Sequence, residues 1–136
     1  MLVNSLYATT AVIETGAGLA LLCLPSAAAK LLLGTALQEP VAFTVARVGG
    51  AGLFTLGIAC WLARSDTQSS AARGLTTAMV VYNLGVALIL GAAGLRLRPV
   101  GVILWPAVVL HTAMTAWCIM TLQYPSIAAR PGNLRQ

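Results

Sequence analysis

Residues 41–63 read VAFTVARVGGAGLFTLGIACWLA, an apolar run in which Arg47 is the only charge. Pro40 precedes the run and is a favourable first helical residue. The run is long enough to cross the roughly 30 Å hydrocarbon core of a bilayer as an α-helix. Arg47, Gly50 and Gly57 share one helical face, and small residues on such a face let a second helix approach closely. The run therefore predicts a membrane-spanning helix that packs through Gly50 and Gly57.

The composition of the whole chain is that of a membrane protein. Of 136 residues, 59% are hydrophobic and only 8% are charged, with a mean hydropathy of +0.89, whereas a soluble domain carries about 25% charged residues. At about 20 residues per crossing, the length allows four spans. We predict an all-α integral membrane protein, an up-down bundle of four transmembrane helices in a single domain, residues 1–124. The spans are expected at about 3–24, 41–63, 75–95 and 100–122, followed by a disordered basic tail, residues 125–136.

Turn and cap signals separate the predicted spans. Residues 26–33 are expected to form a short interfacial helix after the first span, with Gly34 as its C-cap. Ser70 is expected to cap the third helix. Pro106 lies inside the fourth predicted span, where it should remove one hydrogen bond and kink the helix just before His111.

Aromatic and basic residues give the expected placement in the membrane. Four antiparallel crossings would put Tyr7, Trp61 and Tyr124 at one surface and Phe43 and Trp105 at the other, as aromatic belts require. The surface with both termini also holds Arg64, Arg73, Arg130 and Arg135, against Lys30, Arg96 and Arg98 opposite. This excess favours cytoplasmic termini in a multi-pass protein of the inner cell membrane.

Each predicted span has a polar group near its middle: Glu14, Arg47, Tyr82 with Asn83, and His111. A charge at a helix centre costs about 2.5 to 3.5 kcal/mol on insertion scales, so two unpaired charges on separate helices would be unfavourable. We therefore expect a buried ion pair between Glu14 and Arg47, within a Glu-Arg-His polar cluster. These five residues are the candidates for binding a ligand or a proton.

Small residues accompany the polar ones on the first and third spans. Gly18 follows Glu14 on one face, and Ala87 and Gly91 follow Asn83 at four-residue spacing. We expect these residues to pack against other helices.

Several site classes are excluded by the residue inventory. Cys23, Cys60 and Cys118 form no CxxC pair, and a single histidine gives neither a zinc-ligand spacing nor bis-histidine haem ligation. No metal site is expected. No phosphate loop or Ser-His-Asp arrangement is present in the sequence, and the basic residues gather at span ends, which argues against nucleic acid as a partner.

The stretch Val45-Ala46-Arg47-Val48-Gly49-Gly50-Ala51-Gly52-Leu53-Phe54-Thr55-Leu56-Gly57, preceded by Leu31-Leu32-Leu33-Gly34, resembles the second helix of small DoxX-like bacterial membrane proteins. The resemblance implies a four-helix membrane bundle. Members of that family are often of unknown activity, and some relatives act as accessory subunits of quinone-linked oxidoreductases or as assembly factors. Arg47 matches the arginine of that family, whereas Glu14 and His111 match no shared catalytic motif.

Three functions fit these residues. The first is a binding or accessory subunit whose polar cluster holds a lipophilic ligand, such as a quinone or another lipid, or a helix of a membrane protein partner or of a second copy. The second is a proton-coupled small-molecule transporter that uses Glu14. The third is a membrane enzyme in which Glu14 and His111 transfer protons on a lipophilic substrate. For each polar residue the alternative is a structural hydrogen bond or ion pair between helices, and no catalytic residue is assigned.

Overall fold

The computed structural model describes residues 2–66 and 68–123, and within them the chain forms five α-helices. They are α1 (Leu2–Cys23), α2 (Pro25–Leu33), α3 (Pro40–Ala63), α4 (Ser70–Arg96) and α5 (Leu104–Gln123). Among these described helices, α1, α3, α4 and α5 are long and apolar enough to cross a membrane. The predicted fold class is confirmed, and the chain is a multi-pass membrane protein.

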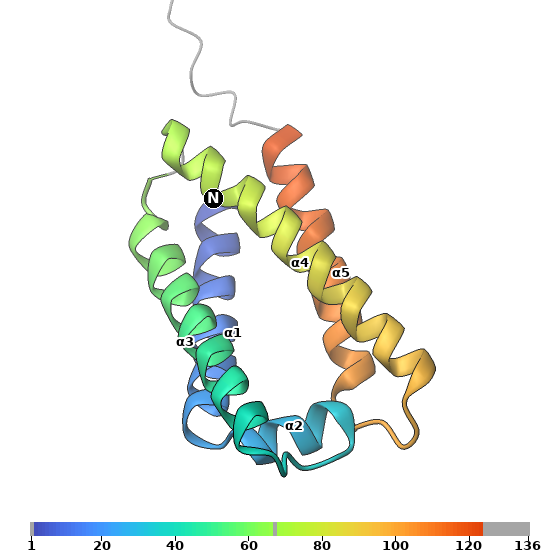
Figure 1. The fold of residues 1–136 in the computed structure, drawn as a ribbon. Helices are drawn as coiled ribbons and strands as arrows, with labels where there is room; N and C mark the ends of the chain where they lie inside the picture. The colour runs from blue at the N-terminus through green and yellow to red at the C-terminus, as the bar shows by residue number, and fades with distance from the viewer. Residues whose placement is uncertain (1, 67, 124–136) are drawn as a thin grey trace, which may run out of the picture.

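The four long helices run up and down as two pairs (Figure 1). Helix α1 packs chiefly on α3, and α4 packs chiefly on α5. The pairs lie close at the end where α1 begins and separate toward the other end, where α2 lies across the bundle (Figure 1). The fold is therefore two helix pairs that meet in one half of the molecule.

Glycine backbones make the α1–α3 contact. A Cβ atom built on Gly18 would lie 2.6 Å from Phe54 N and 2.7 Å from Gly50 O, and one built on Gly50 would lie 2.8 Å from Gly18 O. A Cβ on Gly57 would meet Thr15 and lie 3.1 Å from Ala11 O. Only glycine allows this approach, so the pair depends on these three positions.

Helix α2 connects the two pairs at the open end of the bundle. Pro25 occupies its first turn, and Gly34 ends it in the left-handed conformation at φ 84°, with its N–H donated to Lys30 O, as the sequence indicated. Leu31 O accepts a hydrogen bond of 3.2 Å from Ile103 N, and a Cβ on Gly101 would collide with the same carbonyl. Through Leu31, α2 therefore holds the segment that leads into α5.

Two helix starts differ from the sequence-based expectation. The N-cap of α4 is Ser69 and not Ser70, because Ser69 Oγ accepts the N–H of Ala72 at 3.0 Å. Helix α5 begins at Leu104, so Pro106 lies in its first turn, where a backbone N–H has no acceptor within the helix. The predicted loss of a hydrogen bond and kink at Pro106 were wrong for this reason.

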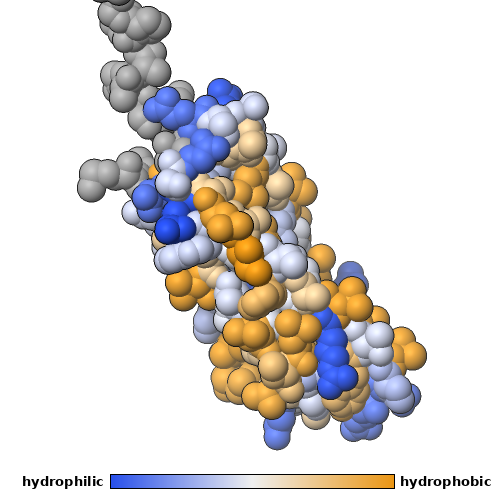
Figure 2. All heavy atoms as spheres, turned by 90° about the vertical axis from the view of Figure 1, so that its left-hand side faces the viewer, coloured by the Kyte–Doolittle hydropathy of each residue, from blue (hydrophilic) through white to orange (hydrophobic). Residues whose placement is uncertain are grey.

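On the face shown in Figure 2, the surface is apolar over its middle, and hydrophilic side chains gather toward the two ends. Exposed aliphatic side chains occur on every long helix, among them Val12, Val48, Ile89 and Val109. Tyr7 departs from the expected aromatic belt because its side chain is fully buried. Tyr124 and the expected tail at 125–136 lie outside the described residues.

Candidate functional site

The buried apolar core occupies the half of the bundle in which the two pairs meet. Its members are Leu6, Tyr7, Ala11, Cys60, Ala72, Met79, Met114 and Cys118. Within this half, the Tyr7 hydroxyl donates to Ala72 O at 2.6 Å and lies 2.7 Å from Thr76 Oγ1, which joins α1 to α4. Glu14, Tyr82, Asn83 and His111 form the next layer toward the open end, and we refer to them as the polar row.

Glu14 and Tyr82 link the two helix pairs. Glu14 is only 3% exposed, and its Oε2 accepts a hydrogen bond of 2.8 Å from the Tyr82 hydroxyl. Spacing of seven residues puts Glu14 on the same face of α1 as Tyr7, which explains why both reach α4. This bond is therefore the second α1–α4 connection, and it lies deeper in the bundle than the first.

Asn83 and His111 link α4 to α5 and fix the orientation of the imidazole. Asn83 Nδ2 donates to Met79 O at 2.8 Å, which leaves Asn83 Oδ1 facing His111 Nδ1 at 2.8 Å. An amide oxygen can only accept, so the neutral imidazole carries its proton on Nδ1 in this arrangement. Nε2 of His111 is then a hydrogen-bond acceptor.

Tyr82 also contacts His111, so the four side chains of the polar row form one group across three helices. The two rings meet edge to face, with centroids 5.8 Å apart and planes at 85°. Glu14 of α1, Tyr82 and Asn83 of α4, and His111 of α5 are thus brought together, as the sequence analysis anticipated for these four.

Arg47 is not part of the polar row, and the expected ion pair with Glu14 is absent. Arg47 is exposed on α3, whereas Glu14 is buried against Tyr82. The level of Glu14 on α3 is that of Gly57, which meets α1 at Ala11 and Thr15. Arg47 precedes Gly57 by ten residues, about 15 Å along the helix axis. The buried cluster therefore contains the glutamate and the histidine without the arginine.

Apolar and partly exposed residues continue the faces of the polar row toward the open end. Leu21 follows Glu14 by two turns, Val86 follows Tyr82 by one turn, and Val108 precedes His111 by one turn. All three are half-buried. The two helix pairs separate in this half of the molecule (Figure 1), and these residues are less buried than those of the core.

The small residues expected to pack on α4 lie in this loosely packed half. Ala87 and Gly91 are only half-buried, and a Cβ built on Gly91 would have nothing within 4 Å. Helix contact through Gly91 was therefore a wrong expectation, because the helix pairs have already diverged at that level. Gly94 makes the close contact, against Leu104 and Trp105 of α5.

Two atoms of the polar row remain available to a ligand. Among the described residues, Glu14 Oε1 and His111 Nε2 have no hydrogen-bond partner, although no fully buried side-chain nitrogen or oxygen there is unsatisfied. Both atoms therefore keep access to their surroundings. The described residues contain no group of three or more His, Cys, Asp or Glu that could hold a metal ion. The site offers hydrogen-bond acceptors beside an apolar surface.

Sequence reasoning missed the contact of Tyr7 with Thr76. The signal was present, since Tyr7 lies one turn before Thr10 and two turns before Glu14 on one face of α1, and that face is the polar one. Tyr7 had been assigned to the membrane interface because tyrosine is common there. Its side chain is instead fully buried in the apolar core, one layer from the polar row, where it bonds to Thr76.

Comparison of the chain with protein-family models, with curated proteins and with solved structures gives no match. The resemblance to DoxX-like proteins therefore stays a prediction from residues 31–57.

Proposed function

We propose that this protein is a membrane binding protein, acting alone or as an accessory subunit, that holds the polar head group of a lipophilic small molecule at the polar row. One observation carries the proposal. The hydrogen-bonded group of Glu14, Tyr82, Asn83 and His111 ends where half-buried apolar faces begin. Ligand sites combine an apolar lining with a few placed polar groups, and the same combination occurs here.

The free atoms indicate which head group the site suits. Glu14 Oε1 and His111 Nε2 are acceptors, while the Tyr82 hydroxyl already donates to Glu14. The complementary ligand carries hydrogen-bond donors, such as the hydroxyl groups of a quinol, on an apolar body. Leu21, Val86 and Val108 would contact that body. The predicted likeness to proteins that serve quinone-linked oxidoreductases favours the same class of molecule.

Co-purification tests this proposal. The protein is extracted in a mild detergent, and lipophilic molecules that remain bound are identified and counted by liquid chromatography and mass spectrometry. We expect one hydroxyl-bearing lipophile at close to one equivalent. His111→Leu should reduce it about tenfold, the equivalent of one lost hydrogen bond of about 1.4 kcal/mol.

The matched control is Thr112→Val, because Thr112 is the exposed neighbour of His111 and its hydroxyl donates to Val108 O of its own helix. This variant should retain the lipophile. Equal amounts of the lipophile in His111→Leu and in Thr112→Val would contradict a head-group site at the polar row. If a partner protein co-purifies and no small molecule does, the polar row binds a helix of that protein and the small-molecule proposal is wrong.

A proton-coupled transporter is the second candidate, and it is favoured because no cationic side chain among the described residues pairs with Glu14. Among the described residues Glu14 bonds to Tyr82 alone, and an uncompensated charge in a membrane interior is costly. Such a carboxyl group suits exchange of a proton for a cationic substrate. Uptake of a lipophilic cation into proteoliposomes, driven by a pH gradient, should then vanish in Glu14→Gln and persist in Glu39→Gln. Uptake that is equal in both variants would rule out this candidate.

The proposed location is the inner cell membrane with both termini in the cytoplasm. Helix α1 begins and α5 ends at the same end of the bundle (Figure 1), where Arg64 follows α3 and Arg73 lies in the first turn of α4. With Arg130 and Arg135, which follow α5 in the sequence, the count is four basic residues against Lys30, Arg96 and Arg98 for the other end. The positive-inside rule places such an end in the cytoplasm. A fluorescent protein fused after Gln136 should fold and fluoresce, while a fused periplasmic phosphatase should be inactive, and the reverse pattern would invert the topology.

A further inference from the structure

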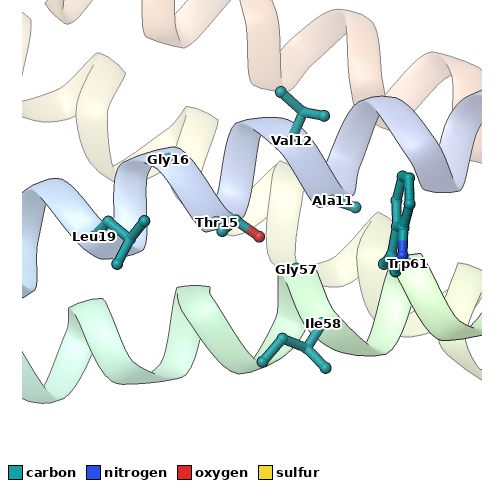
Figure 3. Close-up of a pocket in the computed structure, with 8 residues that line it drawn as sticks. All are labelled: Ala11, Val12, Thr15, Gly16, Leu19, Gly57, Ile58 and Trp61. Carbon is teal, nitrogen blue, oxygen red and sulfur yellow. The ribbon is translucent and has the colours of Figure 1, made fainter.

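A shallow apolar groove runs along the α1–α3 pair (Figure 3). None of the polar-row residues lines it. Its volume is about 500 Å³, within the range of ligand pockets. We call it the α1–α3 groove; its lining residues are Ala11, Val12, Thr15, Gly16, Leu19, Gly57, Ile58 and Trp61. Leu19 stands at one end and Trp61 at the other (Figure 3).

The groove exists because two of its lining residues, Gly16 and Gly57, have no side chain to fill it. Gly57 brings the backbones together and forms the floor, and Gly16 presents no side chain, with nothing within 4 Å of a built Cβ. The walls remain open to the outside, since Val12 is 69% exposed and Trp61 is 48% exposed. In a bilayer this surface faces the lipid.

The position of the groove matches one leaflet of a membrane. Trp61 lies near the end of α3, where tryptophan is favoured at the membrane interface. From Ala11 to Leu19 the axis of α1 rises about 12 Å, close to half of the roughly 30 Å hydrocarbon core. The groove therefore extends from the interface toward the bilayer centre, as an acyl chain does.

Arg64 places a cation at the interfacial end of the groove. Its guanidinium carbon lies 4.1 Å from the centroid of the Trp61 ring, and its Nη1 donates to Trp61 O at 2.6 Å. These two contacts hold the side chain beside the indole and leave further N–H donors free.

Arg64 has no carboxylate partner among the described residues. The sequence has three acidic residues in all. Glu14 is bound to Tyr82 inside the bundle, Asp66 accepts two hydrogen bonds from Ser69, and Glu39 lies beyond the opposite end of α3. A guanidinium that is fixed and unpaired at this depth is complementary to a phosphate group, because its planar donors match phosphate oxygens.

We propose that the α1–α3 groove and Arg64 form a binding site for one anionic membrane phospholipid. The phosphate accepts hydrogen bonds from the Arg64 guanidinium, and one acyl chain lies along Trp61, Ile58 and Leu19. The polar row does not line this site, so it is separate from the proposed head-group site.

The test is a titration of the detergent-solubilised full-length protein with phosphatidylglycerol, with bound lipids counted by native mass spectrometry. The wild type should retain one phosphatidylglycerol more tightly than phosphatidylcholine. Gly16→Leu adds a side chain to the groove at a position where a Cβ meets nothing within 4 Å, and Gly52→Leu is its control, because a Cβ on Gly52 also meets nothing but Gly52 lies outside the groove. Arg64→Gln removes the cation, and Arg73→Gln is its control, because Arg73 is exposed beyond the groove at the same end of the bundle.

We expect Gly16→Leu and Arg64→Gln each to weaken the tightest binding event about tenfold, while both controls keep the wild-type affinity. Equal losses in Arg64→Gln and Arg73→Gln would show a diffuse charge effect and overturn the site. Wild-type affinity in Gly16→Leu would overturn the assignment of the groove to an acyl chain. Phosphatidylcholine bound as tightly as phosphatidylglycerol would overturn the anionic head group.

Discussion

Replacing Gly50 with alanine should separate α1 from α3 and destabilise the protein. The added Cβ would lie 2.8 Å from Gly18 O, 2.9 Å from Leu21 Cβ and 3.0 Å from Leu22 N. The shortest of these falls about 0.6 Å short of the 3.4 Å at which ordinary contacts begin. Backbone atoms cannot turn away as a flexible side chain can, so the helices must move apart.

The size of this effect follows from two opposing contributions. Overpacking costs about 1–3 kcal/mol, whereas an interior Gly→Ala change favours the helix by up to about 1 kcal/mol. The packing cost should win at Gly50, with a net loss of about 1–2 kcal/mol. At Gly52, where a Cβ meets nothing within 4 Å, only the favourable contribution remains, and Gly52→Ala should be neutral or stabilising.

The assay is reversible unfolding in mixed micelles of increasing denaturing detergent, followed by circular dichroism. Gly18→Ala combined with Gly50→Ala adds a further check, because both Cβ atoms strain the same backbone crossing. Once the helices have separated, the second substitution should cost less, so the double variant should be more stable than additivity predicts. Equal stability of Gly50→Ala and Gly52→Ala would refute the packing of α1 on α3 through these glycines.

Three further outcomes are expected. Tyr7→Phe should lower the free energy of unfolding by about 1 kcal/mol in the same assay, because the Tyr7 hydroxyl bonds to Thr76 and to a backbone oxygen of α4 inside the core. An unchanged free energy of unfolding would contradict these buried hydrogen bonds. The double-mutant cycle of Glu14→Gln with Arg47→Met should be additive within about 0.5 kcal/mol, because the two side chains do not meet, and a larger coupling energy would restore the ion pair. Hydrogen bonds from Ser69 hold the pKa of Asp66 below its usual value. The ionised carboxylate therefore stabilises the fold fully above the ordinary pKa, and this stabilisation is lost as the pH falls through the lowered pKa. The free energy of unfolding measured between pH 2 and 6 should show this loss in the wild type and not in Asp66→Asn.

The fold follows from the sequence because its signals are local. Hydropathy sets the four crossings, and Pro40 and Gly34 mark a helix start and a helix end through their own backbone chemistry. The start of α5 was missed because it depends on a contact with Leu31, which is distant in the sequence. Hydropathy also does not distinguish Ser69 from Ser70, since either hydroxyl can cap a helix.

The site could be predicted in part, for a geometric reason. The position of Glu14, Tyr82 and His111 along each span gives their depth, and depth brought these three to one level. The pairing with Arg47 failed because Arg47 lies about 15 Å along the axis of α3 from the level of Glu14, farther than the expected pairing allowed for. The divergence of the two helix pairs at Gly91 could not be predicted either, because it depends on how α2 lies across the bundle.

His111 allows the most direct test of the central claim, that the polar row presents a free acceptor to a ligand head group. It is the single histidine of the chain, so ¹⁵N labelling of histidine gives one imidazole signal pair, provided that the affinity tag contains no histidine. At pH 8, without ligand, the ¹⁵N spectrum should show a protonated Nδ1 and an unprotonated Nε2, and Asn83→Leu should abolish this preference.

Adding a short-chain hydroquinone should move the Nε2 resonance toward the hydrogen-bonded position in the wild type and in Thr112→Val, and leave Nδ1 protonated. A proton on Nε2 before ligand is added, or an Nε2 resonance that hydroquinone leaves unchanged, would contradict the account.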